Sequence, residues 1–192
     1  VQNRQTITAD RIEYVKHPGQ DGVSYTAIGQ VKIQDSTRVA SCGKAIYNRT
    51  EEVTILHIQP EIREENRILS GEKIVLTYKE NELKNIHIPK QARASTISSG
   101  YENTDADSTG QRPTLQFKDV MTSSILKGYF IDGKLDSIRL EGMAATLYHI
   151  FDDSVYQGKN ETSGDTIIMQ FANSELDRIF VDGGSRGVYS PD

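Results

Sequence analysis

Residues 163–185 read SGDTIIMQFANSELDRIFVDGGS, and a weaker copy of this text, SGEKIVLTYKENELKNIHIPKQA, begins at Ser70. The two segments align without a gap, and six of their 23 positions are identical. A third copy, SSILKGYFIDGKLDSIRLEGMAA, lies between them, so that Leu83, Leu135 and Leu176 occupy equivalent positions. Recurrence of this kind is typical of a structure built from stacked repeats.

Each copy predicts a β-hairpin. Its first half carries apolar side chains at every second position, as at Ile167, Met169 and Phe171, which is the period of a strand with one buried face. A short polar stretch follows, and in the middle copy it contains Asp132-Gly133, a strong hairpin signal. The second half alternates again. Because one hairpin cannot bury a face alone, we expect the hairpins to stack into a long folded sheet.

The rest of the chain also predicts strands. Short alternating segments recur at a spacing of about ten residues, and no segment repeats apolar residues with a helical period. We therefore predict an all-β, antiparallel fold with little helix. Leu56, Ile58, Pro60 and Ile62 alternate in one predicted strand, with an edge or a bulge at Pro60, which has no N–H to donate to a ladder.

The length and composition fit a single elongated domain over residues 1–192. Within it, residues 98–112, SSGYENTDADSTGQR, have almost nothing to bury and are predicted to form a polar loop inserted between two halves of one sheet. The hydrophobic content of 36% is modest, which allows a thin or hollow core. The chain begins at Val1 and shows no signal peptide, so we expect a processed form.

Charge and cysteine content narrow the possible partners. A net charge of −5 predicts no basic stripe, so we do not expect nucleic acid to be a partner. Cys42 is the one cysteine and cannot form an intramolecular disulfide. No His or Asp pattern accompanies it, so it is interpreted as a small strand residue and not as a nucleophile.

No constellation of residues predicts catalysis. The four histidines lack metal-ligand spacing, so no metal site is predicted. His149 with Asp152 and Asp153 is the strongest local cluster, although a solvated acidic turn is the simpler interpretation. Glu72 and Asp165 follow Gly in equivalent repeat positions, which favours a structural role. We therefore expect no catalytic residues, no cofactor and no enzymatic activity.

Several segments taken together resemble the OstA-like family, which includes the lipopolysaccharide-transport protein LptA and the N-terminal domain of LptD. The resemblance extends from about Ile7 to Pro191, apart from the predicted loop. The segments that carry it are YTAIGQVKIQD (25–35), VASCGKAIYN (39–48), LSGEKIVLTY (69–78), LEGMAATLY (140–148), GKNETSGDTIIMQF (158–171) and VDGGSRGVYSP (181–191).

This resemblance implies a V-shaped β-jellyroll with a hydrophobic groove between two facing sheets. It implies a periplasmic protein that shields the acyl chains of lipopolysaccharide during outer-membrane biogenesis, in a head-to-tail stack with its own copies or with related β-jellyroll domains. The same residues would also suit any β-sandwich core. The residues that would contact lipid A are Val31, Ile33, Leu56, Ile58, Ile74, Leu76, Tyr78, Leu140, Ile167, Met169 and Phe171.

The alternative is a structural or carbohydrate-binding β-repeat protein of the cell envelope. A carbohydrate-binding surface should carry outward aromatic residues, whereas this chain has no Trp and most of its aromatic residues fall on the predicted inward face. A purely structural repeat should fill its interior with large residues, whereas Gly29, Gly128, Gly142 and Ala144 are small. The sequence leaves open whether the chain is a free bridge protein, a translocon domain or part of a larger protein.

Overall fold

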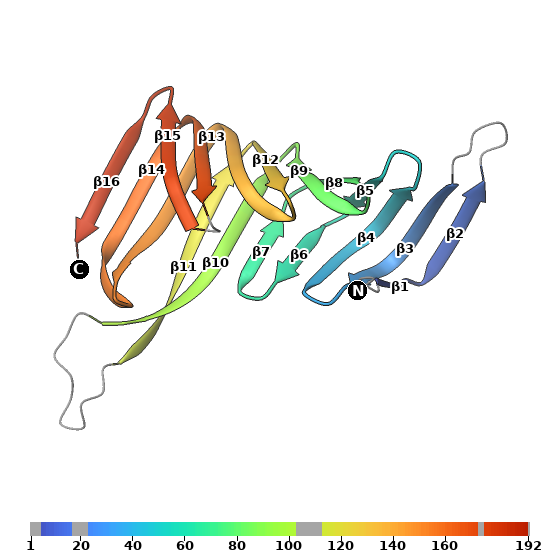
Figure 1. Ribbon diagram of the computed structural model, residues 1–192, viewed down its shortest axis with the longest axis horizontal. Helices are drawn as coiled ribbons and strands as arrows, with labels where there is room; N and C mark the ends of the chain where they lie inside the picture. Colours follow the sequence, from blue (N-terminus) through green and yellow to red (C-terminus); the bar gives the residue numbers. More distant parts are fainter. Residues whose placement is uncertain (1–4, 17–22, 103–112, 173–174, 192) are drawn as a thin grey trace.

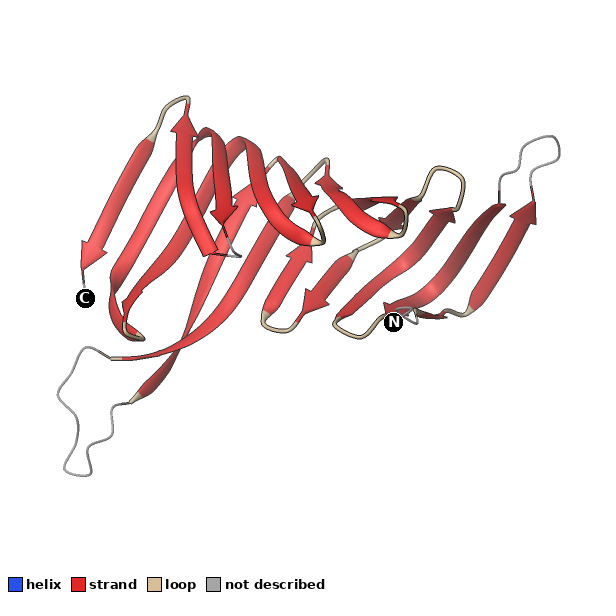
Figure 2. Cartoon of the chain, viewed as in Figure 1, coloured by secondary structure: helices blue, strands red, loops and turns tan. Residues whose placement is uncertain are grey.

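The computed structural model describes residues 5–16, 23–102, 113–172 and 175–191, and these residues form one sixteen-stranded sheet. The described part contains no helix, so the all-β prediction is confirmed (Figures 1 and 2). In particular, none of these residues forms a helix long and apolar enough to span a membrane. The strands are β1 (Thr6–Thr8), β2 (Arg11–Lys16), β3 (Val23–Gln34), β4 (Arg38–Asn48), β5 (Val53–His57), β6 (Glu61–Glu64), β7 (Arg67–Ser70), β8 (Lys73–Lys79), β9 (Glu82–Ile88), β10 (Ala92–Tyr101), β11 (Thr114–Ser123), β12 (Ile125–Ile131), β13 (Lys134–Asp152), β14 (Val155–Ala172), β15 (Glu175–Asp182) and β16 (Arg186–Pro191).

The strands lie side by side along an elongated molecule, with β2 near one end and β16 at the other (Figure 1). Each long strand, or each pair of short strands that continue one another, bends once as it crosses the sheet. These bends divide the sheet into two parts, which we call wing A and wing B. Wing A contains β2, the first half of β3, the second half of β4, β5, β8, β9, β12, the first half of β13, the second half of β14, and β15. Wing B contains β1, the other halves of β3, β4, β13 and β14, and β6, β7, β10, β11 and β16.

The three predicted hairpins are confirmed as β8–β9, β12–β13 and β14–β15. Each contains a register shift at the same place in the repeat, directly before an aromatic residue. A bulge of this kind increases the local twist of a strand pair. The aromatic residue then lies opposite the equivalent leucine, giving the pairs Tyr78–Leu83, Phe130–Leu135 and Phe171–Leu176.

The bends between the wings follow a common backbone pattern. The regular ladder is interrupted at each bend. There, a backbone N–H donates a hydrogen bond to a carbonyl of the neighbouring segment of the sheet. These hydrogen bonds follow one another along the molecule. They mark the line where the two wings meet, which we call the vertex. They run from Asp10 to Gly29 (2.9 Å), Gly43 to Ile58 (2.8 Å), Glu72 to Lys90 (3.1 Å), Ser124 to Gly142 (2.8 Å) and Asp165 to Gly183 (2.7 Å).

Three of these bends contain a glycine with a positive φ angle, at Gly29, Gly142 and Gly183. Gly29 and Gly183 have φ angles of +76° and +73°, in the left-handed region that side chains rarely adopt. A Cβ on Gly29 would lie 2.8 Å from the carboxyl carbon of Asp10, and one on Gly183 would lie 2.6 Å from the Cβ of Asp165. The structural role predicted for Asp165 is therefore confirmed, because its backbone and its side chain both abut the bend.

The predicted strand through Leu56, Ile58, Pro60 and Ile62 is wrong as a continuous strand. Ile58 and Gln59 both have positive φ angles, of 64° and 52°, so the chain bends between β5 and β6. Two consecutive left-handed residues break the alternation of faces, and Ile58 consequently points outward with 62% of its surface exposed. The expected irregularity at Pro60 is correct, since Pro60 is buried at this bend between the two strands.

The polar segment predicted as a loop over residues 98–112 is shorter at its start. Ser98–Tyr101 continue β10 and pair with Thr114–Phe117 of β11, so this part belongs to a strand. Polar side chains do not prevent pairing there, because the ladder uses backbone groups. Residues 103–112 lie outside the described residues.

Candidate functional site

The two wings enclose an apolar interior. On wing A, cross-strand partners form two rows that face the other wing. The row nearer the vertex contains Ile12, Ala27, Ala45, Leu56 and Ile74, and continues with Ile88, Leu126, Leu140, Ile167 and Val181. On wing B, the facing row contains Ile7, Ile33, Ala40, Ile62, Leu69, Ala94 and Met121, and ends in Thr146, Thr162 and Gly187.

The interior is hollow in the N-terminal half of the molecule. A cavity of about 120 Å³ lies between the wings there. Its apolar lining includes Ala27 and Ala45 of wing A and Ala40 of wing B, three small side chains that leave room where the wings meet. Leu56 and Leu76 also line it. The cavity therefore results from small residues at the facing positions of the two wings.

The C-terminal half of the interior is filled. Leu140 and Ile167 are cross-strand partners with no exposed surface, and Met169 is 3% exposed. Leu126 pairs with Leu140 from the other side and is also buried. Large side chains thus occupy the positions that Ala27 and Ala45 occupy in the N-terminal half.

Polar groups line part of the cavity. The Asp35 carboxylate accepts hydrogen bonds from the backbone N–H groups of Thr37 (2.9 Å) and Arg38 (2.8 Å). Burial opposes ionisation of Asp35, but these hydrogen bonds and the charge of Arg38 outweigh it and lower the pKa of Asp35. The Arg38 Nε lies 3.5 Å from Asp35 and 3.7 Å from Glu64. Burial raises the pKa of Tyr78, so its hydroxyl stays neutral here.

The structure gathers ten of the eleven residues that the resemblance indicated into the interior. Val31, Ile33, Leu56, Ile74, Leu76, Leu140, Ile167 and Met169 belong to the buried core, and Tyr78 and Phe171 pack against it. Ile58 is the exception, because the bend at β5–β6 turns it outward. Leu56, Leu76, Tyr78 and Ile33 line the cavity itself, whereas Leu140, Ile167 and Met169 fill the C-terminal half.

Sequence reasoning missed the residues with small side chains that create the cavity. Ala27, Ala40 and Ala45 were not among the residues expected to contact lipid. Their signal is a run of alanines at inward positions on neighbouring strands, which becomes visible only when the register is known.

His149 is held by a residue far away in sequence. The His149 backbone N–H donates to the Asp119 carboxylate at 2.9 Å, and the ring Nδ1 lies 2.7 Å from the same oxygen. Asp152 and Asp153 are exposed where the chain turns from β13 to β14, so the interpretation of a solvated acidic turn is confirmed. Phe117 packs on the His149 ring and stacks on Tyr156. The His149–Asp119 pair therefore links β13 to β11 beside these aromatic rings.

The cysteine is consistent with a packing role. Cys42 is buried in the main core, and burial raises the pKa of its thiol, so the reactive thiolate is disfavoured. Across the described residues, no group of three His, Cys, Asp or Glu side chains is placed to hold a metal ion.

Two bent wings around an apolar interior define a β-jellyroll of the LptA type. Residues 1–82 match the model of the family described as LptA/(LptD N-terminal domain) LPS transport protein. The resemblance expected from the sequence is thus confirmed by this match over residues 1–82. These residues include much of the lining of the cavity.

A solved structure supports the same fold for the whole chain. It is LptH from Pseudomonas aeruginosa, described as the LptA homologous periplasmic component of the conserved lipopolysaccharide transport device. The match has a TM-score of 0.50 and covers 99% of this chain and 97% of that chain, with 10% sequence identity. At this identity the likeness concerns the fold alone. No curated protein sequence matches this chain.

Proposed function

We propose that the protein is a periplasmic carrier that shields acyl chains of lipopolysaccharide in the groove between its wings. The observation that carries this proposal is the apolar cavity in the N-terminal half, within the segment that matches a lipopolysaccharide-transport family. Burial of each methylene group contributes about 0.8 kcal/mol, so an apolar slot favours acyl chains strongly. The proposal treats residues 1–192 as one domain and assigns it no catalytic step.

The size of the cavity sets a condition on this function. Its volume of about 120 Å³ is close to that of an engineered apolar cavity of about 150 Å³ that admits benzene. The closed groove therefore has room for a segment of one acyl chain, and a multi-chain lipid requires the wings to open. Opening at the N-terminal half separates alanine side chains and disrupts less packing than opening the filled C-terminal half.

The ends of the sheet support a proposal about partners. β2 at one end and β15 at the other each pair with one neighbour among the described strands. Tyr14 and Phe180 leave 58% and 50% of their surfaces exposed at these ends. Open edges of this kind can pair with another strand. We propose head-to-tail stacking with further copies or with related β-jellyroll domains, which would join the grooves.

Photo-crosslinking tests the proposed lipid site. A photoreactive residue at Leu76, which lines the cavity, should capture lipopolysaccharide in a Gram-negative host. One at Lys32, exposed on the opposite face of β3, should not. Capture at Met169 should be weaker than at Leu76 because that part of the interior is filled. Equal capture at Leu76 and Lys32 would reject the groove as the site.

A further inference from the structure

The outer face of wing A carries a line of basic and imidazole side chains. Each of these residues is adjacent in sequence to a buried core residue. Because successive side chains of a strand alternate between its two faces, the basic and imidazole groups point away from the groove. They occupy six strands that follow one another in the sheet, β4, β5, β8, β9, β12 and β13. We call them the basic stripe: Lys44, His57, Lys73, His87, Lys127 and Arg139.

The fold creates this stripe from residues spread over almost a hundred positions. Lys44, His57 and Lys73 are direct cross-strand partners, and so are His87, Lys127 and Arg139. The two triplets are close together, because the charges of Lys73 and Lys127 both act on His87. The absence of a basic stripe predicted from the net charge of −5 is thus wrong. Net charge reports a sum, and the strand register decides where the charges gather.

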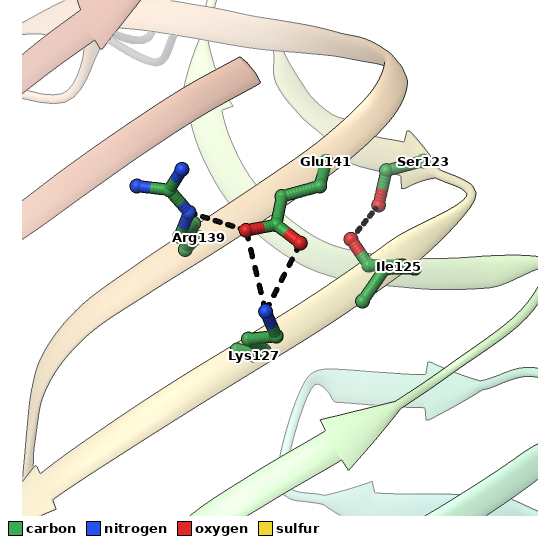
Figure 3. Close-up of polar contacts among 5 residues, drawn as sticks. All are labelled: Ser123, Ile125, Lys127, Arg139 and Glu141. Carbon is green, nitrogen blue, oxygen red and sulfur yellow. Dashed lines mark hydrogen bonds and ion pairs between the residues drawn. The ribbon is translucent and has the colours of Figure 1, made fainter. Parts of the chain in front are cut away.

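One end of the stripe already holds a carboxylate. Glu141 accepts a hydrogen bond from Lys127 at 3.0 Å and another from Arg139, so a single carboxylate bridges cations of neighbouring strands (Figure 3). At the other end, Lys44 and Lys73 form no ion pair with any described residue, although both lie beside His57. The arrangement at Glu141 therefore shows how a carboxylate could sit between Lys44 and Lys73.

We propose that the basic stripe is a docking surface for an extended acidic segment of a partner protein. With strands about 4.8 Å apart, the stripe spans roughly 24 Å, which matches about seven residues of extended chain. Four cations face one carboxylate along it, so charge complementarity favours an acidic occupant.

The surroundings of the stripe favour a narrow occupant over a broad anionic surface. Acidic residues lie in the turns at the rim of wing A, at Glu51, Glu80 and Asp132, and near the vertex at Glu72 and Asp165. A membrane of anionic lipid would place its negative charges against the acidic residues at the rim and against those near the vertex. An extended segment one strand wide would lie between these two groups of acidic residues.

Binding of a labelled seven-residue glutamate peptide to the whole chain, measured by fluorescence anisotropy at low salt, tests this proposal. Replacing Lys44→Glu and Lys73→Glu together should weaken binding by about tenfold or more, because two favourable charge pairs are lost and the reversed charges repel the peptide. The matched control is Lys79→Glu with Lys134→Glu, which makes the same charge change at exposed positions off the stripe. This control should bind like the unchanged chain, and a glutamine version of the peptide should not bind.

The two histidines supply an independent readout. Burial, with the charges of Lys73 and Lys44, lowers the pKa of His57, and burial with Lys127 and Lys73 lowers the pKa of His87, opposed by Glu141. A bound carboxylate favours the protonated histidines and so raises the pKa of both, which means that the complex takes up protons. The affinity should therefore rise as the pH falls from about 7.5 to about 5.5, a range in which glutamate stays ionised. Replacing His57→Gln and His87→Gln should flatten the profile.

Three results would overturn the proposal. The first is no binding of the glutamate peptide by the unchanged chain. The second is equal weakening by the two double substitutions, which would mean that only net charge matters. The third is binding to vesicles of phosphatidylglycerol that depends on Lys44 and Lys73 while the peptide does not bind, which would make the stripe a lipid-binding surface.

Discussion

Replacing Ala45→Phe is expected to reduce lipopolysaccharide binding by about tenfold or more. Ala45 is 5% exposed and lines the cavity between Ala27 and Leu56 of the neighbouring strands. A phenyl ring at this position would occupy the space that an acyl chain needs, and each excluded methylene removes about 0.8 kcal/mol of binding energy. Equilibrium binding of labelled lipopolysaccharide to the purified protein measures the effect.

The matched control is Ala172→Phe, at an exposed position at the end of β14. It adds the same ring outside the groove and should leave binding unchanged. Overpacking at a buried position typically costs about 1–3 kcal/mol of stability, so thermal unfolding must accompany the binding measurement. Full binding by a folded Ala45→Phe variant would place the lipid somewhere else.

Replacing Leu140→Ala is expected to lower the free energy of unfolding by about 2–5 kcal/mol, because it leaves a cavity in the filled half of the interior. Leu140 has no exposed surface and lies between Leu126 and Ile167 in neighbouring strands. Large neighbours on both sides limit how far the site can collapse. The midpoint of urea unfolding, followed by far-ultraviolet circular dichroism, measures the loss.

Ile131→Ala is the control for this substitution. Ile131 is 59% exposed at the end of β12, and its truncation should change stability by no more than about 0.5 kcal/mol. A loss at Leu140 no larger than the loss at Ile131 would mean that the C-terminal half is not tightly packed. The contrast between a hollow half and a filled half of the groove would then be wrong.

The repeated hairpins could be predicted because the relevant signals are local. The alternation at Ile167, Met169 and Phe171 and the turn at Asp132-Gly133 each involve neighbouring residues, and the strands formed as expected. The bend at Ile58 could not be predicted in the same way. A β-branched residue rarely adopts a positive φ angle, and Ile58 does so at the vertex, where its carbonyl accepts a hydrogen bond from the distant Gly43 N–H.

Features that depend on register remained hidden in the sequence. The partner of His149 is Asp119, which reaches it because β11 lies beside β13. Likewise, the cavity depends on Ala40 and Ala45 facing each other from the two wings, although only five positions separate them in the chain. Strand alternation indicated which residues point inward, while the space between the wings depends on which inward residues meet.

The central claim is that the groove holds an acyl chain of lipopolysaccharide. The most direct test is native mass spectrometry of the protein purified gently from a Gram-negative host. The expected result is a bound species that releases lipid A or its fatty acids, present in the unchanged chain and in Ala172→Phe and strongly reduced in Ala45→Phe. Protein that carries no lipid under these conditions, or carries the same lipid after Ala45→Phe, would contradict the claim.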